Sequence, residues 1–116
     1  MHEIGLMQNV LEMSFERANA HQAKRIDAIN LRIGTLAGVV PEALEFAFAC
    51  MRKGTLAESA RLNIEQVPVV CWCRKCKSEF SPENGFSLCP ECGLNDIEMR
   101  SGLEMNLVSV EVSDHV

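Results

Sequence analysis

Apolar residues recur at steps of three and four positions along the first twenty residues of the chain. This spacing places them on one face of an amphipathic helix, which we expect to run from Ile4 to about Gln22. Glu3 comes just before it, where a negative charge suits the positive end of a helix dipole. The predicted buried face consists of Ile4, Met7, Val10, Leu11, Phe15 and Ala18.

A strand, a loop and a second helix are predicted next. Alternating apolar residues indicate a strand over Arg25–Ile33, and residues 34–40 are expected to form a loop. Pro41 suits the first helical position, where the amide proton that it lacks would have no partner. The helix should end near Lys53-Gly54, since glycine commonly follows a helix. Its predicted buried stripe is Leu44, Ala47, Phe48 and Met51, with Cys50 expected in the core beside it.

Two further strands are predicted, at Arg61–Val67 and Leu103–Val112. In the first of these, Leu62 and Ile64 should face inward. In the last strand the apolar residues change parity, from Leu103, Met105 and Leu107 to Val108, Val110 and Val112. Either a β-bulge shifts the inward face, or the two halves pack on different partners; we favour the bulge.

These elements predict an α+β fold, in which a small mixed three-stranded sheet carries both helices on one face. The first two strands are joined through a helix, which permits a parallel crossover, whereas the second and third should run antiparallel. The cysteine-rich segment between the second and third strands is then an inserted module. We call residues 1–69 together with 103–116 the base, and residues 70–102 the ribbon.

Four of the six cysteines form two close pairs, Cys73-Arg-Lys-Cys76 and Cys89-Pro-Glu-Cys92. Four thiolates are a ligand set that tetrahedral Zn(II) prefers, and each short turn lets backbone amides point at the sulfurs. Gly93 permits the turn after the second pair. The twelve residues between the pairs can fold as a small hairpin that holds the two cysteine turns together. Trp72, Phe80 and Phe86 are expected to form a small core beneath the metal. We therefore predict a zinc-ribbon module, whose metal contributes folding energy.

Other uses of paired cysteines fit the chain less well. Disulfides need an oxidising compartment, yet the N-terminus lacks the basic and apolar regions of a signal peptide. No apolar run is long enough to cross a membrane. A thioredoxin-like site needs one pair that opens a helix, not two symmetric pairs. A reduced metal site in a cytoplasmic protein is the expectation.

The charge argues against a nucleic-acid partner. The 116-residue chain has a formal net charge of −5, and the ribbon holds four basic residues against five acidic ones. Binding to a phosphate backbone requires a basic surface. We therefore expect partners other than nucleic acid or a membrane.

The start of the chain offers a second kind of metal site. With Met1 retained, a metal bound by the terminal amine, the His2 amide and the His2 imidazole closes a five-membered and a six-membered ring. Planar coordination by nitrogen favours Ni(II) or Cu(II) over Zn(II). Glu3 can fill the remaining position with its amide or its carboxylate. Taken alone, a histidine at position 2 also fits an exposed, frayed terminus.

These features occur in a specific order and spacing along the whole chain. Met1-His2-Glu3 opens it, Arg32-Ile33-Gly34 closes the first strand, and Cys71-Trp72-Cys73 leads into the two cysteine pairs. In this respect the chain resembles the HypA/HybF family, the nickel metallochaperones for [NiFe]-hydrogenase maturation. The metal ligands that the resemblance implies are Met1, His2 and Glu3 for Ni(II), the cargo, and Cys73, Cys76, Cys89 and Cys92 for Zn(II), the structural ion.

The resemblance also implies partners. It implies delivery of nickel to the hydrogenase large subunit, cooperation with a nickel-handling GTPase, and, as in some members, a part in urease maturation with its proteins. We expect a monomer or a weak homodimer. No enzyme is predicted, because the chain shows neither a phosphate-binding glycine loop nor a nucleophile paired with a base.

Other interpretations stay open. The cysteine pairs also resemble the iron site of rubredoxin, an electron-transfer protein, and a zinc-ribbon adaptor in transcription or translation is a further alternative. Cys71 is expected to be a free, partly buried thiol, with replacement of a zinc ligand as its alternative role.

Overall fold

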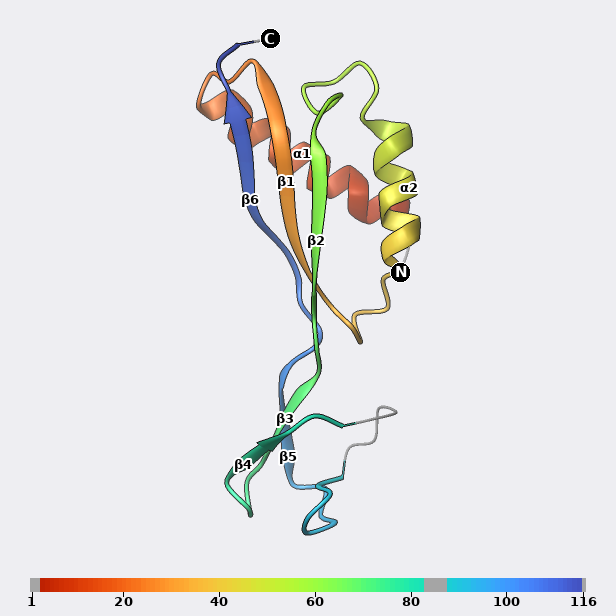
Figure 1. Cartoon of the computed structure of the whole chain (residues 1–116), viewed down its shortest axis with the longest axis vertical. Helices are drawn as coiled ribbons and strands as arrows, with labels where there is room; N and C mark the ends of the chain where they lie inside the picture. The colour runs from red at the N-terminus through yellow and green to blue at the C-terminus, as the bar shows by residue number, and fades with distance from the viewer. Residues whose placement is uncertain (1–2, 83–87, 116) are drawn as a thin grey trace.

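The computed structural model describes residues 3–82 and 88–115, and it is elongated, with extents of 57 × 25 × 16 Å. Helices and one sheet gather at one end and a second sheet lies at the other (Figure 1). The base contains α1 (Glu3–Ala20), β1 (Arg25–Gly34), α2 (Pro41–Met51), β2 (Arg61–Val67) and β6 (Met105–Ser113). The ribbon contains β3 (Val70–Cys73), β4 (Ser78–Phe80) and β5 (Ile97–Ser101).

The base sheet has the order β2-β1-β6. β1 pairs with β2 in parallel and with β6 in antiparallel fashion, so the predicted mixed three-stranded sheet is confirmed. β2 and β6 run in opposite directions, as expected, but they lie on either side of β1 and do not pair with each other. The ribbon therefore leaves the base from one edge strand and returns through the other.

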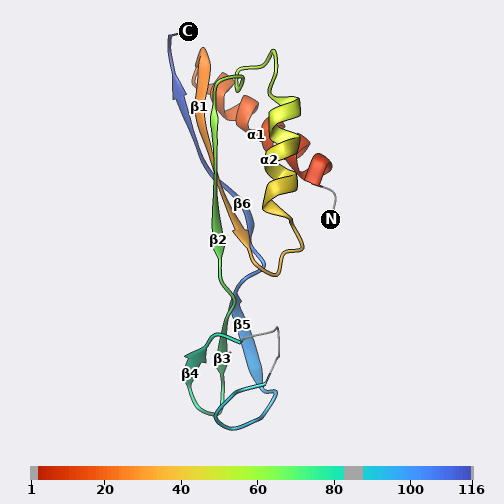
Figure 2. The ribbon, with the colours of Figure 1, turned by 45° about the vertical axis from the view of Figure 1, so that its right-hand side comes forward.

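Both helices cover one face of this sheet (Figures 1 and 2). α1 buries Met7, Val10, Leu11 and Ala18 of its predicted stripe, and Phe15 packs partly buried against the core. The Ser14 hydroxyl, which is also buried, donates to the Val10 carbonyl at 2.7 Å. Ile4 is a correction, because its side chain is 64% exposed. It lies in the first turn of α1, where its side chain lines an open hollow beside α2 and is not packed into the core. The buried core is Met7, Val10, Leu11, Ala18, Ile26, Ile29, Leu31, Ile33, Leu44, Ala47, Phe48, Ala57 and Ala60.

α2 begins at Pro41 as predicted and ends at Met51, two residues before Lys53. Leu44, Ala47 and Phe48 are buried and Met51 packs against the core. The expectation that Cys50 lies in the core is wrong, since this residue is exposed. The buried positions follow three- and four-residue steps, and residue 50 falls between them, on the outer side of the helix.

The predicted bulge lies in β6. Asn30 pairs with Ser109 and Leu31 with Leu107, so Val108 has no partner on β1. Its side chain is 52% exposed, whereas Leu107 and Val110 on either side pack against the core. The extra residue thus reverses the inward parity within the strand. The strand begins at Met105 and not at Leu103, which is exposed in the turn that enters the strand.

Two close-packed glycines join the base to the ribbon. A Cβ atom on Gly34 would lie 2.1 Å from the backbone carbon and oxygen of Gly102, which is itself in the left-handed region with φ 122°. The Leu36 amide donates to the Gly102 carbonyl at 2.9 Å, and the Gly34 amide to the Glu104 carbonyl at 2.8 Å. The end of β1 is thereby fastened to the strand that returns from the ribbon.

The ribbon sheet has the order β4-β3-β5, with both pairings antiparallel. Its hairpin consists of β3 and β4, and the Cys73–Cys76 turn connects them. In the described part of the segment between the cysteine pairs, β4 pairs with β3. Residues 83–87, which belong to the predicted hairpin of this segment, lie outside the described residues. Phe86 lies outside the described residues, while Trp72 and Phe80 are half-buried.

Candidate metal centre

The two cysteine pairs form turns of the same design. The Lys77 amide donates to the Cys73 carbonyl, and the Gly93 amide donates to the Cys89 carbonyl, both at 2.8 Å. Lys77 and Gly93 each adopt a positive φ, 54° and 72°. The expected role of Gly93 is confirmed, whereas Lys77 adopts this conformation although it carries a side chain. The two turns thus present their cysteines in equivalent ways.

The four sulfur atoms converge on one point. Those of Cys73 and Cys92 are 3.7 Å apart, those of Cys76 and Cys89 are 3.9 Å apart, and all four lie within 4.8 Å of one another. Zinc holds thiolates tetrahedrally at about 2.3 Å, which separates the sulfurs by about 3.8 Å. The donor set and its spacing therefore fit Zn(II). A sulfur-only site without an open position is also the usual form of a structural zinc site.

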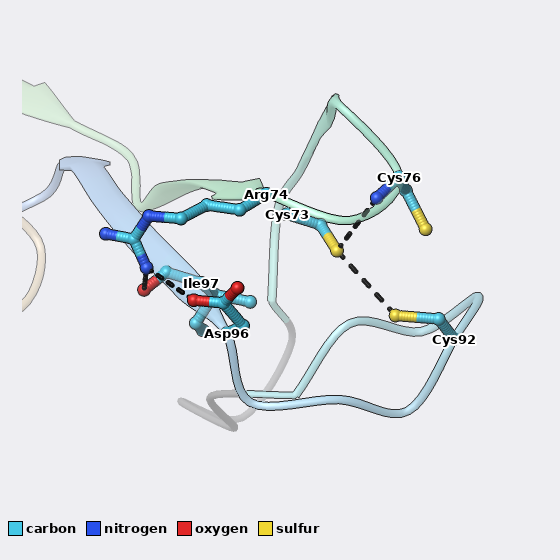
Figure 3. Close-up of polar contacts among 6 residues, drawn as sticks. All are labelled: Cys73, Arg74, Cys76, Cys92, Asp96 and Ile97. Atoms are coloured by element: carbon cyan, nitrogen blue, oxygen red, sulfur yellow. Dashed lines mark hydrogen bonds and ion pairs between the residues drawn. The ribbon is translucent and has the colours of Figure 1, made fainter.

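Backbone groups around the sulfurs favour the ionised state that a metal requires. The Cys76 amide points at the Cys73 sulfur at 3.4 Å (Figure 3). Backbone amides of Cys92 and Glu91 lower the pKa of the Cys89 thiol to about 7. The neighbouring Cys73 thiol raises the pKa of Cys76 to about 12, since adjacent thiols resist losing several protons together. A divalent cation at the centre relieves this repulsion.

An ion pair links the first cysteine turn to the segment that follows the second. Arg74 donates to the Asp96 carboxylate at 2.8 Å and to the Ile97 carbonyl at 3.4 Å (Figure 3). The Arg74 amide also donates to the Asp96 carbonyl at 3.2 Å. These contacts hold the two halves of the site together outside the sulfur atoms. On the same sheet, the Arg100 guanidinium lies 4.2 Å above the Trp72 ring.

The two remaining cysteines stand apart from this cluster. Cys71 is buried in β3, opposite Phe80 on one side and Met99 on the other. It is a free thiol and does not belong to the group of four. Cys50 is a free, exposed thiol on α2. Neither takes part in the cluster as the structure places it.

The nickel ligands predicted at the start of the chain are placed only in part. Met1 and His2 lie outside the described residues. Glu3 begins α1, and its carboxylate accepts a hydrogen bond from the Val40 amide at 3.1 Å. Val40 is the residue that precedes α2, and it has no side-chain cap. Glu3 thus stabilises the starts of two helices. Its negative charge suits the positive end of the α1 dipole, and its carboxylate accepts the backbone amide that precedes α2.

A profile described as "Hydrogenase/urease nickel incorporation, metallochaperone, hypA" matches residues 1–112 of the chain. The chain belongs to the HypA family. Among curated HypA proteins, the hydrogenase maturation factor of Picosynechococcus sp. is 43% identical over 112 residues, which are 97% of this chain and 99% of that protein. The hydrogenase maturation factor HypA of Rhizobium leguminosarum bv. viciae is 37% identical over the same shares.

Solved HypA structures share the fold. The solution structure of the Ni metallochaperone HypA from Helicobacter pylori matches with a TM-score of 0.67 at 25% identity, over 99% of this chain and all of that one. A second solution structure of a HypA protein matches with a TM-score of 0.74, also at 25% identity, over 99% and 98%. A HypA protein is a metallochaperone for hydrogenase maturation and not an enzyme.

Three features of the HypA metal regions were not predicted from the sequence. They are the left-handed Lys77, the ion pair between Arg74 and Asp96, and the bond from Val40 to Glu3. Opposite charges close to both cysteine pairs are a weak signal for the ion pair. The other two have no sequence signal, because lysine rarely adopts a positive φ and the Glu3 contact spans 37 residues.

Proposed function

We propose that this HypA chain holds Ni(II) at Met1, His2 and Glu3 and delivers it to the large subunit of a [NiFe] hydrogenase. The observation that carries the proposal is the family match, which spans residues 1–112 and so includes Met1-His2-Glu3 as well as the ribbon. A planar nitrogen site at a chain end is open on two sides, so ligands of a recipient can approach the ion. Such a site suits a cargo that must leave again.

The second metal in the proposal is a structural Zn(II) held by Cys73, Cys76, Cys89 and Cys92. The separations of 3.7 and 3.9 Å between their sulfurs support it, as does the absence of an open position in a four-thiolate site. We propose that the base and the ribbon are separate domains. The base holds the cargo Ni(II), and the ribbon holds the structural Zn(II). Exchange at one site then leaves the other intact.

Within the nickel site, we assign the backbone amide of Glu3 as a ligand in preference to its carboxylate. The carboxylate already accepts the Val40 amide at 3.1 Å. An amide must lose its proton to bind the ion, so nickel affinity should rise with pH.

The proposal also includes the partners implied by the family. A nickel-handling GTPase supplies the nucleotide hydrolysis for which this chain has no phosphate-binding loop in its sequence. The family description names urease beside hydrogenase, and urease maturation is included as a second route. No helix in the described part of the chain is long and apolar enough to cross a lipid bilayer. We place the carrier in the cytoplasm, as a monomer or a weak homodimer.

Nickel titration of three forms of the full chain tests the N-terminal site. The forms are the native protein, His2→Ala, and a chain with two residues added before Met1. Both changes should abolish planar nickel binding, because one removes the imidazole and the other moves the terminal amine. The zinc content, measured on the same samples, should stay the same. Native-like nickel affinity in both variants would remove the N-terminal site from the proposal.

The same samples discriminate the alternative functions. A rubredoxin-like protein would be coloured by iron and would hold no zinc. A nucleic-acid-binding adaptor would bind RNA or DNA with an affinity that falls steeply with salt. The match to HypA proteins over nearly the whole chain favours the nickel carrier over both.

A further inference from the structure

A cavity of about 340 Å³ lies between the first turn of α1 and the middle of α2. Its walls are mainly apolar, with one carboxylate, and they consist of Glu3, Ile4, Ala43, Phe46 and Ala47. In both views the N-terminal end of α1 lies beside α2 (Figures 1 and 2). The cavity is near the small end of the range for ligand pockets, about 300–1,000 Å³, and suits one or two large side chains.

Two large apolar side chains at this cavity are left in water. Phe46 is 72% exposed and Ile4 is 64% exposed, the two highest values among the large apolar residues in the described part of the chain. Phe46 does not contribute to the core, because Leu44, Ala47 and Phe48 are the residues of α2 that are buried there. Exposed aromatic residues beside a small apolar hollow are typical of the centre of a protein interface.

The charges around the cavity have one sign. Residues 3–16 and 33–51, which include most of α1 and all of α2, contain no lysine or arginine and five glutamates. Glu42 and Glu45 lie on α2 close to Phe46, and Gln8 and Glu12 follow Ile4 at four-residue steps, on the same face of α1. The groove between the two helices is therefore apolar at its centre and acidic at its rim.

We propose that this groove binds an amphipathic helix of a partner protein, with apolar anchors on one face and lysine or arginine on its flanks. Helix-in-groove binding uses anchors at three- and four-residue steps, which matches a groove between two packed helices. Basic flanks complement Glu12, Glu42 and Glu45, and rim charges of this kind speed association and select the partner. The same rim repels anionic lipid and a second copy of this acidic chain.

The lining of the groove includes Glu3, which is also one of the proposed nickel ligands. A partner that docks there is placed to receive or supply the ion. In this respect the inference rests on the proposed function, and it adds where the partner binds and by which chemistry.

The probe for the test is a synthetic 18-residue helix of leucine and lysine only, with leucine on one face. It is titrated into the full, zinc-loaded chain while the backbone amides are followed by NMR. We expect shifts at Glu3, Ile4, Ala43 and Phe46, and none in the ribbon. A peptide of the same composition in scrambled order, and one with glutamate in place of lysine, should bind at least tenfold more weakly.

Variants then connect the binding to the groove. Phe46→Ala should weaken the peptide at least tenfold, as removal of a central anchor does. Leu103→Ala is the matched control, because Leu103 is a similarly exposed apolar residue, 59%, in the turn next to the ribbon. It should leave the affinity unchanged. Nickel titration of Phe46→Ala should match the native protein, so a failed nickel site and a failed groove remain distinguishable.

Several results would overturn the inference. One is equal binding of the amphipathic and scrambled peptides, and another is equal affinity in Phe46→Ala and the native chain. Sedimentation that shows a native dimer and a monomeric Phe46→Ala would assign the groove to a second copy. Binding of this face to vesicles of phosphatidylserine would assign it to a membrane.

Discussion

The base and the ribbon of this chain are stabilised in different ways. The base buries a cluster of thirteen side chains between two helices and a sheet. In the described part of the ribbon, the buried apolar residues are Cys71, Cys73 and Cys89 alone, and two of these belong to the four-sulfur cluster. Hydrophobic burial therefore stabilises the part that carries the proposed cargo site, and we expect the other part to depend on metal binding instead.

The largest expected effect is the loss of the ribbon when its metal is removed. Zinc binding to small cysteine sites supplies an apparent 10–16 kcal/mol, roughly the whole folding free energy of such a segment. Chelation of the metal, or Cys73→Ser, should abolish the ribbon's dispersed amide signals in an NMR spectrum and leave those of the base in place. Zinc content by elemental analysis should fall from about one ion per chain towards zero.

A core substitution in the base gives the reverse experiment. Met7 is fully buried, so Met7→Ala should lower the free energy of unfolding of the base by about 2–5 kcal/mol, with zinc content unchanged. Denaturant unfolding followed by the circular dichroism of the helices measures this change. Unfolding of the base in Cys73→Ser to the same extent as in Met7→Ala would show that the two parts fold as one unit.

A smaller effect is expected where the two parts meet. Gly34→Ala places a methyl group against the backbone of Gly102, which cannot turn aside as a flexible side chain would. We expect a loss of about 1–3 kcal/mol, and displacement of the ribbon because Gly34 and Leu36 bond to residues 102 and 104. NMR orientational restraints between the two sheets measure the displacement.

Gly38→Ala is the control for this prediction. Nothing lies near an added methyl group there, so it introduces no clash, although its positive φ of 77° carries its own strain. It should therefore destabilise the base without moving the ribbon. An unchanged orientation in Gly34→Ala would mean that the glycine contact does not set the angle between the sheets.

The features that the sequence predicted well depend on residues close together in the chain. Helix periodicity identified the buried face of α2, and the change of parity after Leu107 identified the bulge at Val108. The spacing of the four cysteines predicted that their sulfurs would meet. In each case a short pattern and one physical rule suffice.

The features that it missed depend on contacts between distant segments. Ile4 continues the apolar pattern of its helix and is nevertheless exposed, because periodicity does not tell which part of a helix face the tertiary structure covers. Cys50 is an apolar residue beside the buried stripe of α2, and its exposure shows that residue type alone did not place it in the core. The Glu3 carboxylate meets Val40 only after the chain has passed through β1. Arg74 and Asp96 come together across 22 residues that include the second cysteine pair. Such contacts follow from the tertiary structure and not from a local pattern.

Removal of an exposed ion pair should change stability least. Each part of the chain contains one such pair that can be compared. Arg32–Glu65 joins β1 and β2 at 3.1 Å, and Arg74–Asp96 joins the first cysteine turn to the segment after the second at 2.8 Å. Exposed pairs contribute about 0–1 kcal/mol, so Arg32→Ala should lower the unfolding free energy of the base by no more than that.

Arg74→Ala should leave the stability of the base unchanged and speed the transfer of zinc to a chelator by less than about tenfold. The reason for the difference is position: Arg74 lies between two ligands of the cluster, Cys73 and Cys76, so its loss acts on the lifetime of the metal site. Equal destabilisation of the base by both variants would contradict the separation of the two parts, since Arg74 contributes nothing to the base core.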